Sequence, residues 1–205
     1  MNLVLIVVSA LMISPTRSAL AADKITPKIA TATFAGGCFW CMQPPYEKLP
    51  GVISVTVGYT GGTKANPTYE EVSSGATGHA ESVQIVFNDS KTSYSQLLDV
   101  FWRNINPTTL NQQFADTGTQ YRTAIFYHNK EQKKFALASK EKLQKSGKFK
   151  DPIVTEIVPA LAFYPAEEHH QKYYKKNPLR YNLYHQASGR DRYIEKIWGK
   201  SPEKK

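Results

Sequence analysis

Hydrophobic and polar residues alternate, or β-branched residues accumulate, in five short segments of the chain. Alternation with a period of two is typical of a strand that buries one face. Gly36-Gly37 and Gly61-Gly62 close the first two of these segments. The predicted strands are residues 29–34, 52–59, 80–87, 122–127 and 153–159.

Between these strands, other segments repeat their apolar positions every three or four residues, which is the spacing of an amphipathic helix. Pro44-Pro45 fall in the first turns of one such segment, where proline is tolerated. Gly147 stops another, a long charged one. We predict helices at residues 38–49, 94–104 and 130–144, a short helix or turn at 68–72, a polar loop at 106–118, and mostly helix and irregular structure after residue 159.

The order of these elements predicts the fold class. Strands and helices are interleaved, but not in the strict strand–helix–strand order of a doubly wound protein. With 205 residues and no internal repeat or linker, the chain is expected to form one α+β domain. Its fold would be a mixed β-sheet covered by helices.

The N-terminus has the features of a secretory signal. Residues 3–13 form an apolar run that is shorter than the roughly 20 residues needed to span a bilayer. Ala19-Leu20-Ala21 follows as an A-x-A cleavage pattern. We therefore expect residues 1–21 to be cleaved, the domain to cover residues 22–205, and the mature protein to be periplasmic or secreted, without stable membrane association. Arg17 follows the apolar run and no basic residue precedes it, so an uncleaved anchor or a disordered tail stays open.

The net charge of +9, from 26 Lys and Arg against 17 Asp and Glu, would permit weak binding to acidic surfaces. The basic residues are scattered, however, and no nucleic-acid-binding motif is present. A solvated basic face is therefore the expected interpretation, with no nucleic-acid partner.

Cys38 and Cys41 are the two cysteines, and they lie three residues apart. A disulfide between them would close almost no loop and stabilise the fold little, which favours a chemical role. Gly36-Gly37 allow a sharp turn from strand to helix, so Cys38 would sit in the first helical turn. Free backbone N–H groups there favour an anion, which predicts a lowered pKa and a thiolate near neutral pH.

The cysteine motif resembles the signature of the A-type peptide methionine sulfoxide reductases. Six blocks follow one another in family order from about residue 31 to residue 182, which makes the resemblance specific. They are Gly37-Cys38-Phe39-Trp40, Gly58-Tyr59-Thr60-Gly61-Gly62, Asn66-Pro67-Thr68-Tyr69, Thr77-Gly78-His79-Ala80-Glu81, Asp116-Thr117-Gly118-Thr119-Gln120-Tyr121-Arg122, and Pro165-Ala166-Glu167 with His170-Gln171 and Lys176-Asn177-Pro178.

The resemblance implies a role for individual residues. Cys38 matches the nucleophile, and Phe39 with Trp40 matches the pocket for the methyl group of the sulfoxide. Glu81 matches the acid that protonates the sulfoxide oxygen. Other matches are substrate-binding residues: Tyr69 and Tyr121 as hydroxyls that reach this oxygen, Asp116 as a polar support through water, and Tyr173 as a further site tyrosine. His79 lies in a matching block with either a structural or a catalytic role.

The implied reaction agrees with the chemistry of these residue types. The sulfur of a sulfoxide becomes electrophilic when its oxygen is protonated, and a carboxyl among aromatic rings keeps its proton because burial raises its pKa. A thiolate that attacks this sulfur ends as a sulfenic acid, which condenses with a second thiol. The substrate would be the S epimer of methionine sulfoxide, in proteins and free, and the outcome repair of oxidised proteins.

One position departs from the family pattern. Asn182 stands where many members carry a resolving cysteine. Cys41 is then the intramolecular thiol left to form a disulfide with Cys38. The resemblance implies no bound cofactor, and thioredoxin or a thioredoxin-like dithiol as the reductant.

Three alternatives remain at this stage. The Cys-x-x-Cys spacing also fits a general dithiol–disulfide oxidoreductase. The charge would fit a basic binding module without enzymatic activity. His169, His170 and His185 could suggest a metal, but two cysteines are only half of a zinc site, so we expect no metal.

Overall fold

The computed structural model describes residues 28–199. The predicted signal peptide, residues 1–21, lies outside the described residues. Within residues 28–199, no helix is both long and apolar enough to cross a membrane.

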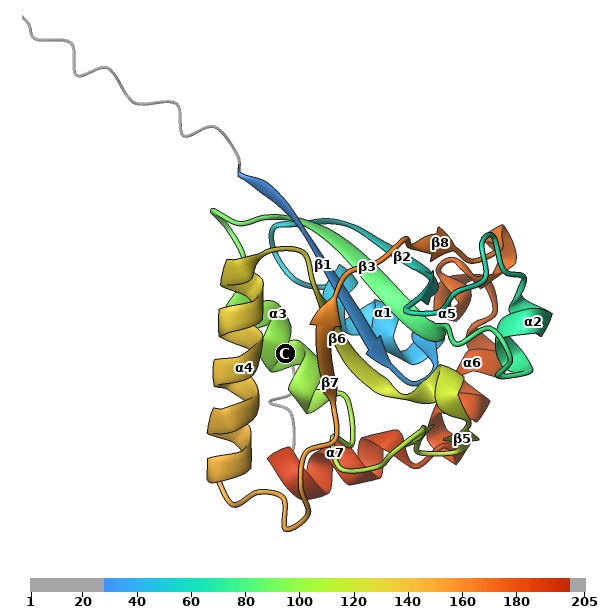
Figure 1. The fold of residues 1–205 in the computed structure, drawn as a ribbon. Helices are drawn as coiled ribbons and strands as arrows, with labels where there is room; N and C mark the ends of the chain where they lie inside the picture. Colours follow the sequence, from blue (N-terminus) through green and yellow to red (C-terminus); the bar gives the residue numbers. More distant parts are fainter. Residues whose placement is uncertain (1–27, 200–205) are drawn as a thin grey trace, which may run out of the picture.

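Six strands form the central mixed sheet, in the order β7-β6-β1-β3-β2-β8 (Figure 1). All neighbouring strands are antiparallel except β6 and β7, which are parallel. This arrangement and the covering helices confirm the predicted α+β fold. The strands are β1 (Ile29–Gly36), β2 (Val52–Thr60), β3 (Ala80–Asn88), β6 (Thr123–Tyr127), β7 (Glu156–Pro159) and β8 (Tyr164–Pro165).

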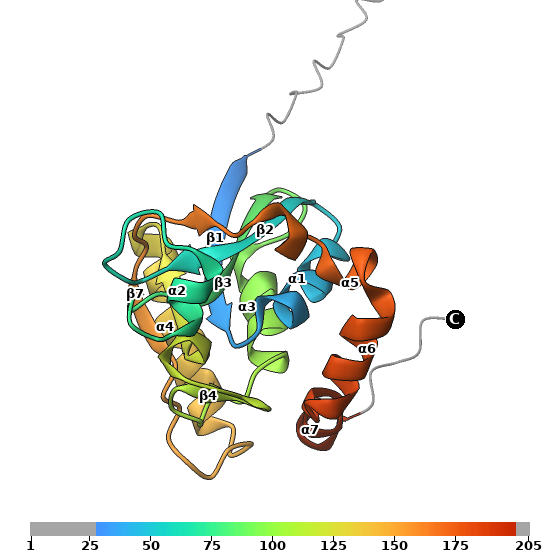
Figure 2. The same cartoon turned by 90° about the vertical axis from the view of Figure 1, so that its right-hand side faces the viewer.

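One large apolar cluster joins the sheet to the helices, because alternate strand residues point to opposite faces. In β1, Phe34 belongs to this cluster, whereas Ala35 belongs to a small cluster on the other face. The ring of Phe34 stacks on Tyr46 of α1 and Phe101 of α3, at centroid distances of 5.7 and 5.2 Å. α1 (Phe39–Glu47) and α3 (Tyr94–Arg103) lie on one side of the sheet, and α4 (Lys130–Lys145) lies beside α3 (Figure 2).

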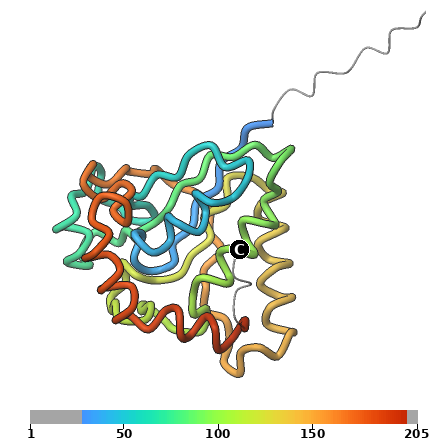
Figure 3. The backbone as a smooth tube through the Cα atoms, turned by 180° about the vertical axis from the view of Figure 1, so that it is seen from behind, coloured from blue at the N-terminus to red at the C-terminus, as the bar shows by residue number. Residues whose placement is uncertain are grey.

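The chain after β8 folds back toward the start of α1. Figure 3 shows this C-terminal segment, in orange and red, passing beside the blue segment that contains α1. It consists of the 3-10 turn Glu168–His170 and of α5 (Tyr173–Lys176), α6 (Pro178–Ala187) and α7 (Arg190–Trp198). Residues more than 130 positions apart in the sequence therefore share one region of the fold.

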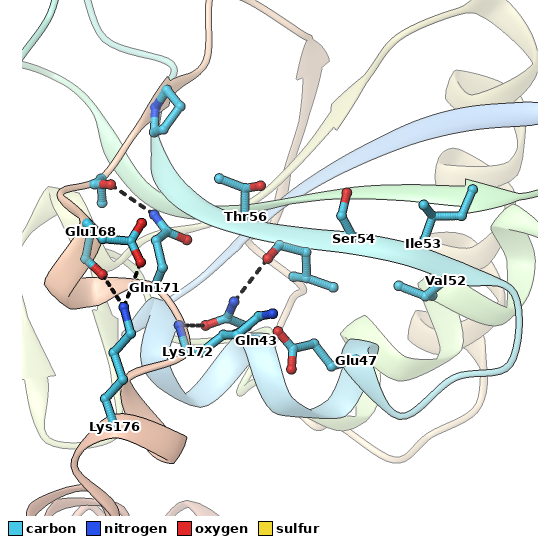
Figure 4. A pocket seen from close by; sticks show the side chains of 13 residues that line it. Gln43, Glu47, Val52, Ile53, Ser54, Thr56, Glu168, Gln171, Lys172 and Lys176 are labelled. Atoms are coloured by element: carbon cyan, nitrogen blue, oxygen red, sulfur yellow. Dashed lines mark hydrogen bonds and ion pairs between the residues drawn. The ribbon is translucent and has the colours of Figure 1, made fainter.

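The free edge of β2 is covered by side chains instead of a full strand, because β8 pairs only with Gly58 and Tyr59. The Gln171 amide accepts a hydrogen bond from the Val57 N–H at 3.0 Å and donates one to the Val57 carbonyl at 2.8 Å. The Gln43 amide donates to the Val55 carbonyl at 3.0 Å (Figure 4). These amides satisfy edge groups that would otherwise be open to pairing with another chain. The adjoining cavity, of about 600 Å³, contains neither cysteine.

Several predicted boundaries differ from the structure. The last predicted strand begins at Glu156 and not at residue 153, because Ile153 and Val154 bond to Gln144 and Pro107 before the pairing with β6 begins. The predicted polar loop 106–118 contains a short hairpin of β4 (Gln112–Gln113) and β5 (Asp116–Thr117). The segment 68–72, predicted as a short helix or turn, is the helix α2 (Tyr69–Ser73), which begins with a capping box of Thr68 and Glu71.

Candidate active site

Cys38 lies at the turn between the central strand β1 and helix α1. It is the N-cap residue of α1, and its carbonyl accepts hydrogen bonds from the backbone N–H groups of Cys41 and Met42. Gly37 has a φ of +79°, and a Cβ atom there would lie 2.4 Å from the Cβ of Gln113. Glycine meets both demands, so the backbone requires the glycine that precedes Cys38 in the motif.

A small cavity of about 130 Å³ opens beside Cys38. Seven of the residues selected from the sequence share this cavity, although they come from five segments of the chain. An eighth, Tyr184, was not selected. The lining residues are Cys38, Phe39, Trp40, Tyr69, Glu81, Asp116, Tyr121 and Tyr184.

Glu81 is the acid of this cavity. It lies on β3 opposite Tyr59 of β2, and its carboxyl accepts a hydrogen bond of 3.0 Å from the Phe39 N–H. Burial raises the pKa of Glu81 well above its usual range, and the nearby negative charge of an ionised Cys38 would raise it further. The bond from Phe39 opposes these effects but does not outweigh them. The neutral, protonated form of Glu81 is therefore favoured.

Phe39 and Trp40 form an aromatic wall of the cavity, and the C-terminal segment holds this wall in place. Tyr173 stacks on Trp40 with a centroid distance of 3.9 Å and an angle of 8° between the rings. The indole N–H of Trp40 donates a hydrogen bond of 3.2 Å to Nδ1 of His170. Tyr173 therefore packs behind Trp40 and does not line the cavity. It was predicted to contact the substrate, but the structure places Trp40 between Tyr173 and the cavity.

Tyr184 of α6 lies on the polar side of the cavity, and its hydroxyl donates to the carboxyl of Asp116. Burial raises the pKa of Asp116, while the bond from Tyr184 and the charge of Arg190 oppose this rise. Tyr184 is one of 12 tyrosines and follows the last matching block of sequence. No signal in the sequence distinguishes it, because only the return of α6 brings it to Asp116.

Glu167 has a supporting role that sequence analysis did not assign. Its carboxylate accepts hydrogen bonds of 2.8 Å from the Tyr59 hydroxyl and of 2.8 Å from the Tyr69 backbone N–H. It therefore joins β2 to the start of α2 and holds Tyr69 at the cavity. The block Pro165-Ala166-Glu167 carried this signal, but the sequence cannot distinguish a half-buried carboxylate that links two elements from a surface carboxylate.

The prediction that Cys38 is a thiolate near neutral pH is wrong for this structure. Cys38 is only 6% exposed, and its burial raises the pKa of the thiol well above the ordinary value. The hydrogen bond with Cys41 adds to this increase. The helix N-terminus favours an anion, but removal from water outweighs that effect.

Cys41 lies directly behind Cys38 and outside the small cavity. Both thiols are free and buried, and they are hydrogen-bonded to each other. The bond from Cys38 lowers the pKa of Cys41, and the charge of Arg190 lowers it further, despite burial. Cys41 instead lines a second cavity, of about 570 Å³, between α1 and the last two helices.

The histidines of the chain are engaged in structural contacts. The ring nitrogens of His79 contact the Gly62 N–H at 3.1 Å and the Lys64 carbonyl at 2.7 Å, which favours its structural role. His185 contacts Asp191 at 3.2 Å. Among residues 28–199, no group of three or more His, Cys, Asp or Glu side chains could hold a metal ion.

The raised pKa of Glu81 predicts a pH-dependent cost to stability. Its pKa in the unfolded chain is about 4.3. Above this value the unfolded chain releases a proton that the native state keeps, so the wild type loses stability as the pH rises toward the native pKa. Glu81→Gln does not titrate. Its free energy of unfolding relative to wild type should therefore increase by about 1.4 kcal/mol per pH unit within that window.

Urea unfolding of both proteins between about pH 5 and pH 8 measures this difference. The same substitution at the exposed Glu131 serves as the control. A difference that stays constant across this range would show that Glu81 is already ionised in the native state.

Known proteins resemble this chain over most of its length. The family model described as "Peptide methionine sulfoxide reductase" matches residues 30–202. Among curated proteins, the peptide methionine sulfoxide reductase MsrA of Bacillus licheniformis is 55% identical over 82% of this chain and 93% of its own. The MsrA of Bacillus subtilis is 54% identical over 85% of this chain and 99% of its own.

Solved structures show the same fold. Reduced Mxr1 from Saccharomyces cerevisiae has a TM-score of 0.69 and 36% identity, over 74% of this chain and 87% of its own. Methionine sulfoxide reductase A of Corynebacterium diphtheriae has a TM-score of 0.67 and 33% identity, over 75% and 77%. Mxr1 in complex with Trx2 has a TM-score of 0.51 and 27% identity, over 74% and 91%. The chain therefore belongs to the peptide methionine sulfoxide reductase family, of the A type that these relatives represent.

Proposed function

We propose that this methionine sulfoxide reductase acts on the S epimer of its substrate, with Cys38 as nucleophile, Glu81 as acid and Cys41 as resolving thiol. One observation carries the proposal. Cys38 and a buried Glu81, whose pKa is raised by its burial, face the same small cavity, between an aromatic wall and a set of hydroxyl groups. A sulfoxide has the matching parts: an electrophilic sulfur, a basic oxygen and a methyl group.

The cavity suits a neutral substrate. The methyl group would lie against Phe39 and Trp40, and the oxygen would point toward Glu81, Tyr69 and Tyr121. Burial raises the pKa of the two tyrosines, so their hydroxyl groups keep their protons and can donate. A sulfoxide brings no charge into this apolar site, so its entry avoids the large cost of burying an ion.

In the first step, Glu81 donates its proton to the sulfoxide oxygen while the Cys38 sulfur attacks the substrate sulfur. An S–S bond forms between the two sulfurs as the S–O bond breaks, and the oxygen leaves as water with the protons of Glu81 and Cys38. That water then attacks the Cys38 sulfur and returns a proton to Glu81, the S–S bond breaks toward the substrate sulfur, and Cys38 is left as a sulfenic acid. Methionine leaves, reduced by two electrons, and Cys38 is oxidised by two. The proton that Cys38 loses replaces the one that Glu81 gives, so the site returns to a neutral carboxyl.

In the second step, the Cys41 sulfur attacks the Cys38 sulfenic acid. A disulfide forms between Cys38 and Cys41, and the hydroxyl group leaves as water with the proton from Cys41. The contact between the two thiols supports this step, because the sulfurs are already neighbours. The bond still requires disulfide geometry, which a small unwinding of the first turn of α1 would provide.

The reductant that reopens the disulfide would be thioredoxin or a thioredoxin-like dithiol. The relative Mxr1 has been solved in complex with Trx2, which supports this class of partner. The substrates would be oxidised methionines in proteins and free methionine sulfoxide, with protein repair as the outcome. The enzyme would need no bound cofactor, because both electrons come from thiols.

The stereochemistry gives the first test. A wall on one side and hydroxyl donors on the other accept one arrangement of methyl group and oxygen around a chiral sulfur. Turnover on resolved epimers of a methionine sulfoxide peptide should therefore be confined to the S epimer. Comparable rates on both epimers would contradict the proposed orientation. Disulfide reduction without any sulfoxide turnover would favour the alternative dithiol oxidoreductase.

Glu81→Gln tests the acid. Glutamine keeps the size of the side chain but cannot donate a carboxyl proton, and general acid catalysis contributes about 10²–10⁴-fold. The single-turnover rate of methionine formation should fall by about this factor. Alkylation of Cys38 by a small reagent should continue, which would show an intact nucleophile. A near-normal rate would place the acid elsewhere.

Cys41→Ser tests resolution. The variant should release about one methionine per enzyme without reductant and stop as a sulfenic acid on Cys38, because a hydroxyl group is a poor nucleophile toward sulfur. Mass analysis should show one added oxygen, whereas the wild type should lose two hydrogens. Turnover driven by thioredoxin should collapse, and a small dithiol should restore part of it. Cys38→Ser is the control and should release no methionine. Normal turnover of Cys41→Ser with thioredoxin would contradict resolution by Cys41.

For the compartment, we propose export, most simply to a bacterial periplasm, on the basis of the apolar run and the A-x-A site. N-terminal sequencing of protein recovered from cells should then begin near Ala22. An intact Met1 on a cytosolic form would contradict export. An exported enzyme would also need a reductant outside the cytosol to keep Cys38 and Cys41 reduced.

A further inference from the structure

Arg190 is a charged side chain buried beside the two cysteines. It begins α7 and is only 2% exposed. Its guanidinium donates hydrogen bonds to the carbonyls of Gly36, at 3.3 Å, and Asn104, and Nη1 contacts the sulfur of Met42 at 3.7 Å. The group lies 4.4 Å from the centre of the Phe114 ring.

The charge of Arg190 has no close counterion in the described part of the chain. Among residues 28–199, no Asp or Glu side chain forms an ion pair with it. Its Nε atom is also buried and has no hydrogen-bond partner. An uncompensated buried cation is costly, and a neutral side chain could fill the same space. Hydrogen bonds to carbonyl groups alone therefore do not explain why an arginine occupies this buried position.

The guanidinium lies against the chain segment that carries both thiols. It contacts Gly36 and Met42, which are the two ends of the short segment that contains Cys38 and Cys41. A Cβ atom on Gly37 would lie 3.4 Å from Nη2. Arg190 thus lies against the turn that changes when the disulfide forms.

The groups around Cys41 divide into those that favour its ionised form and those that oppose it. Cys38, through its hydrogen bond, and Arg190 favour the thiolate. Burial opposes it, and so would negative charge on Asp116 of β5 or on Glu81 of β3. From α6 and α7, Tyr181 interacts with Cys41, and His185 and Asp191 line the same cavity but pair with each other. Lys48 and Arg103 also line this cavity, and Arg190 is the cation that contacts the turn holding both cysteines.

We propose that Arg190 is a positioning residue for the resolution step, which holds the Gly36–Met42 turn and uses its uncompensated charge to favour the thiolate of Cys41. The inference rests on the proposed role of Cys41. The thiolate attacks the Cys38 sulfenic acid, the S–O bond breaks, and the departing hydroxide takes the proton that Cys41 released. Once the disulfide is formed, the negative charge is gone.

The test measures the ionisation of Cys41 without requiring activity. Cys38→Ser leaves Cys41 as the one thiol, whose pKa is obtained from the pH dependence of thiolate absorbance and of alkylation rate. The pKa of Cys41 in the wild-type Arg190 background serves as the reference, because Cys38→Ser also removes the hydrogen bond from the Cys38 thiol. Adding Arg190→Gln should raise it by about one unit, which is a tenfold loss of thiolate near neutral pH. Arg190→Lys should keep part of the effect because it keeps the charge.

Arg192→Gln, at an exposed position of the same helix, is the matched control and should leave this pKa unchanged. A folded Arg190→Gln variant with an unchanged Cys41 pKa would overturn the proposal and leave Arg190 a structural clamp. If Arg190→Gln does not fold, the disulfide-formation kinetics of Arg190→Lys decide.

A second measurement separates this proposal from the proposed function. In the enzyme with both cysteines, Arg190→Lys should slow disulfide formation more than methionine release, and a higher pH should restore the slower step. Equal slowing of both steps at every pH would overturn the role in resolution. Absence of methionine release from the wild type would instead contradict the proposed function, and the titration of Cys41 would still stand.

Discussion

The hydrogen bond from the Phe39 N–H to the Glu81 carboxyl joins the first turn of α1 to the middle of the sheet. It spans 42 positions of sequence and is fully buried, so the carboxyl cannot move without disturbing the start of the helix. Because Cys38 is the residue just before Phe39, this one bond sets the distance between nucleophile and acid. The aromatic packing of Phe34 on Tyr46 and Phe101 then fixes α1 and α3 on the sheet from the other side of the turn.

Burial decides the charge state of the site. The helix start that holds Cys38 should favour a thiolate, and the hydrogen bond to Glu81 should favour a carboxylate, yet both groups have raised pKa values because they are removed from water. Both groups therefore favour their neutral forms, which suits a neutral sulfoxide. In the proposed resolution step, the negative charge lies on Cys41, outside the cavity and on the side of the buried Arg190.

The C-terminal segment completes a site that the first half of the chain begins. Tyr173 and His170 hold Trp40, Glu167 holds Tyr69, Tyr184 reaches Asp116, and Arg190 reaches the cysteine turn. These contacts also attach the C-terminal segment to the start of the domain, because this segment leaves the sheet and returns beside α1. A disulfide between Cys38 and Cys41 would alter the first turn of α1 and thus the surface against which this segment packs.

The sequence by itself determined the strands, the long helices, the α+β class and the position of the reactive cysteine at a helix start. Periodicity and glycine placement are local signals, and a residue such as Gly37 has a conformation that no other residue accepts. The matching blocks also identified Glu81, Tyr69, Tyr121 and Asp116, which the fold brings to one cavity. The boundary of the last strand and the hairpin within residues 106–118 could not be predicted, because bonds to distant segments decide them. The tertiary structure alone decided that Tyr184 and Arg190 lie beside the site and that the pKa of Cys38 is raised. Burial and electrostatic surroundings are the sum of neighbours far apart in the sequence, and they exist only once the chain has closed around the site.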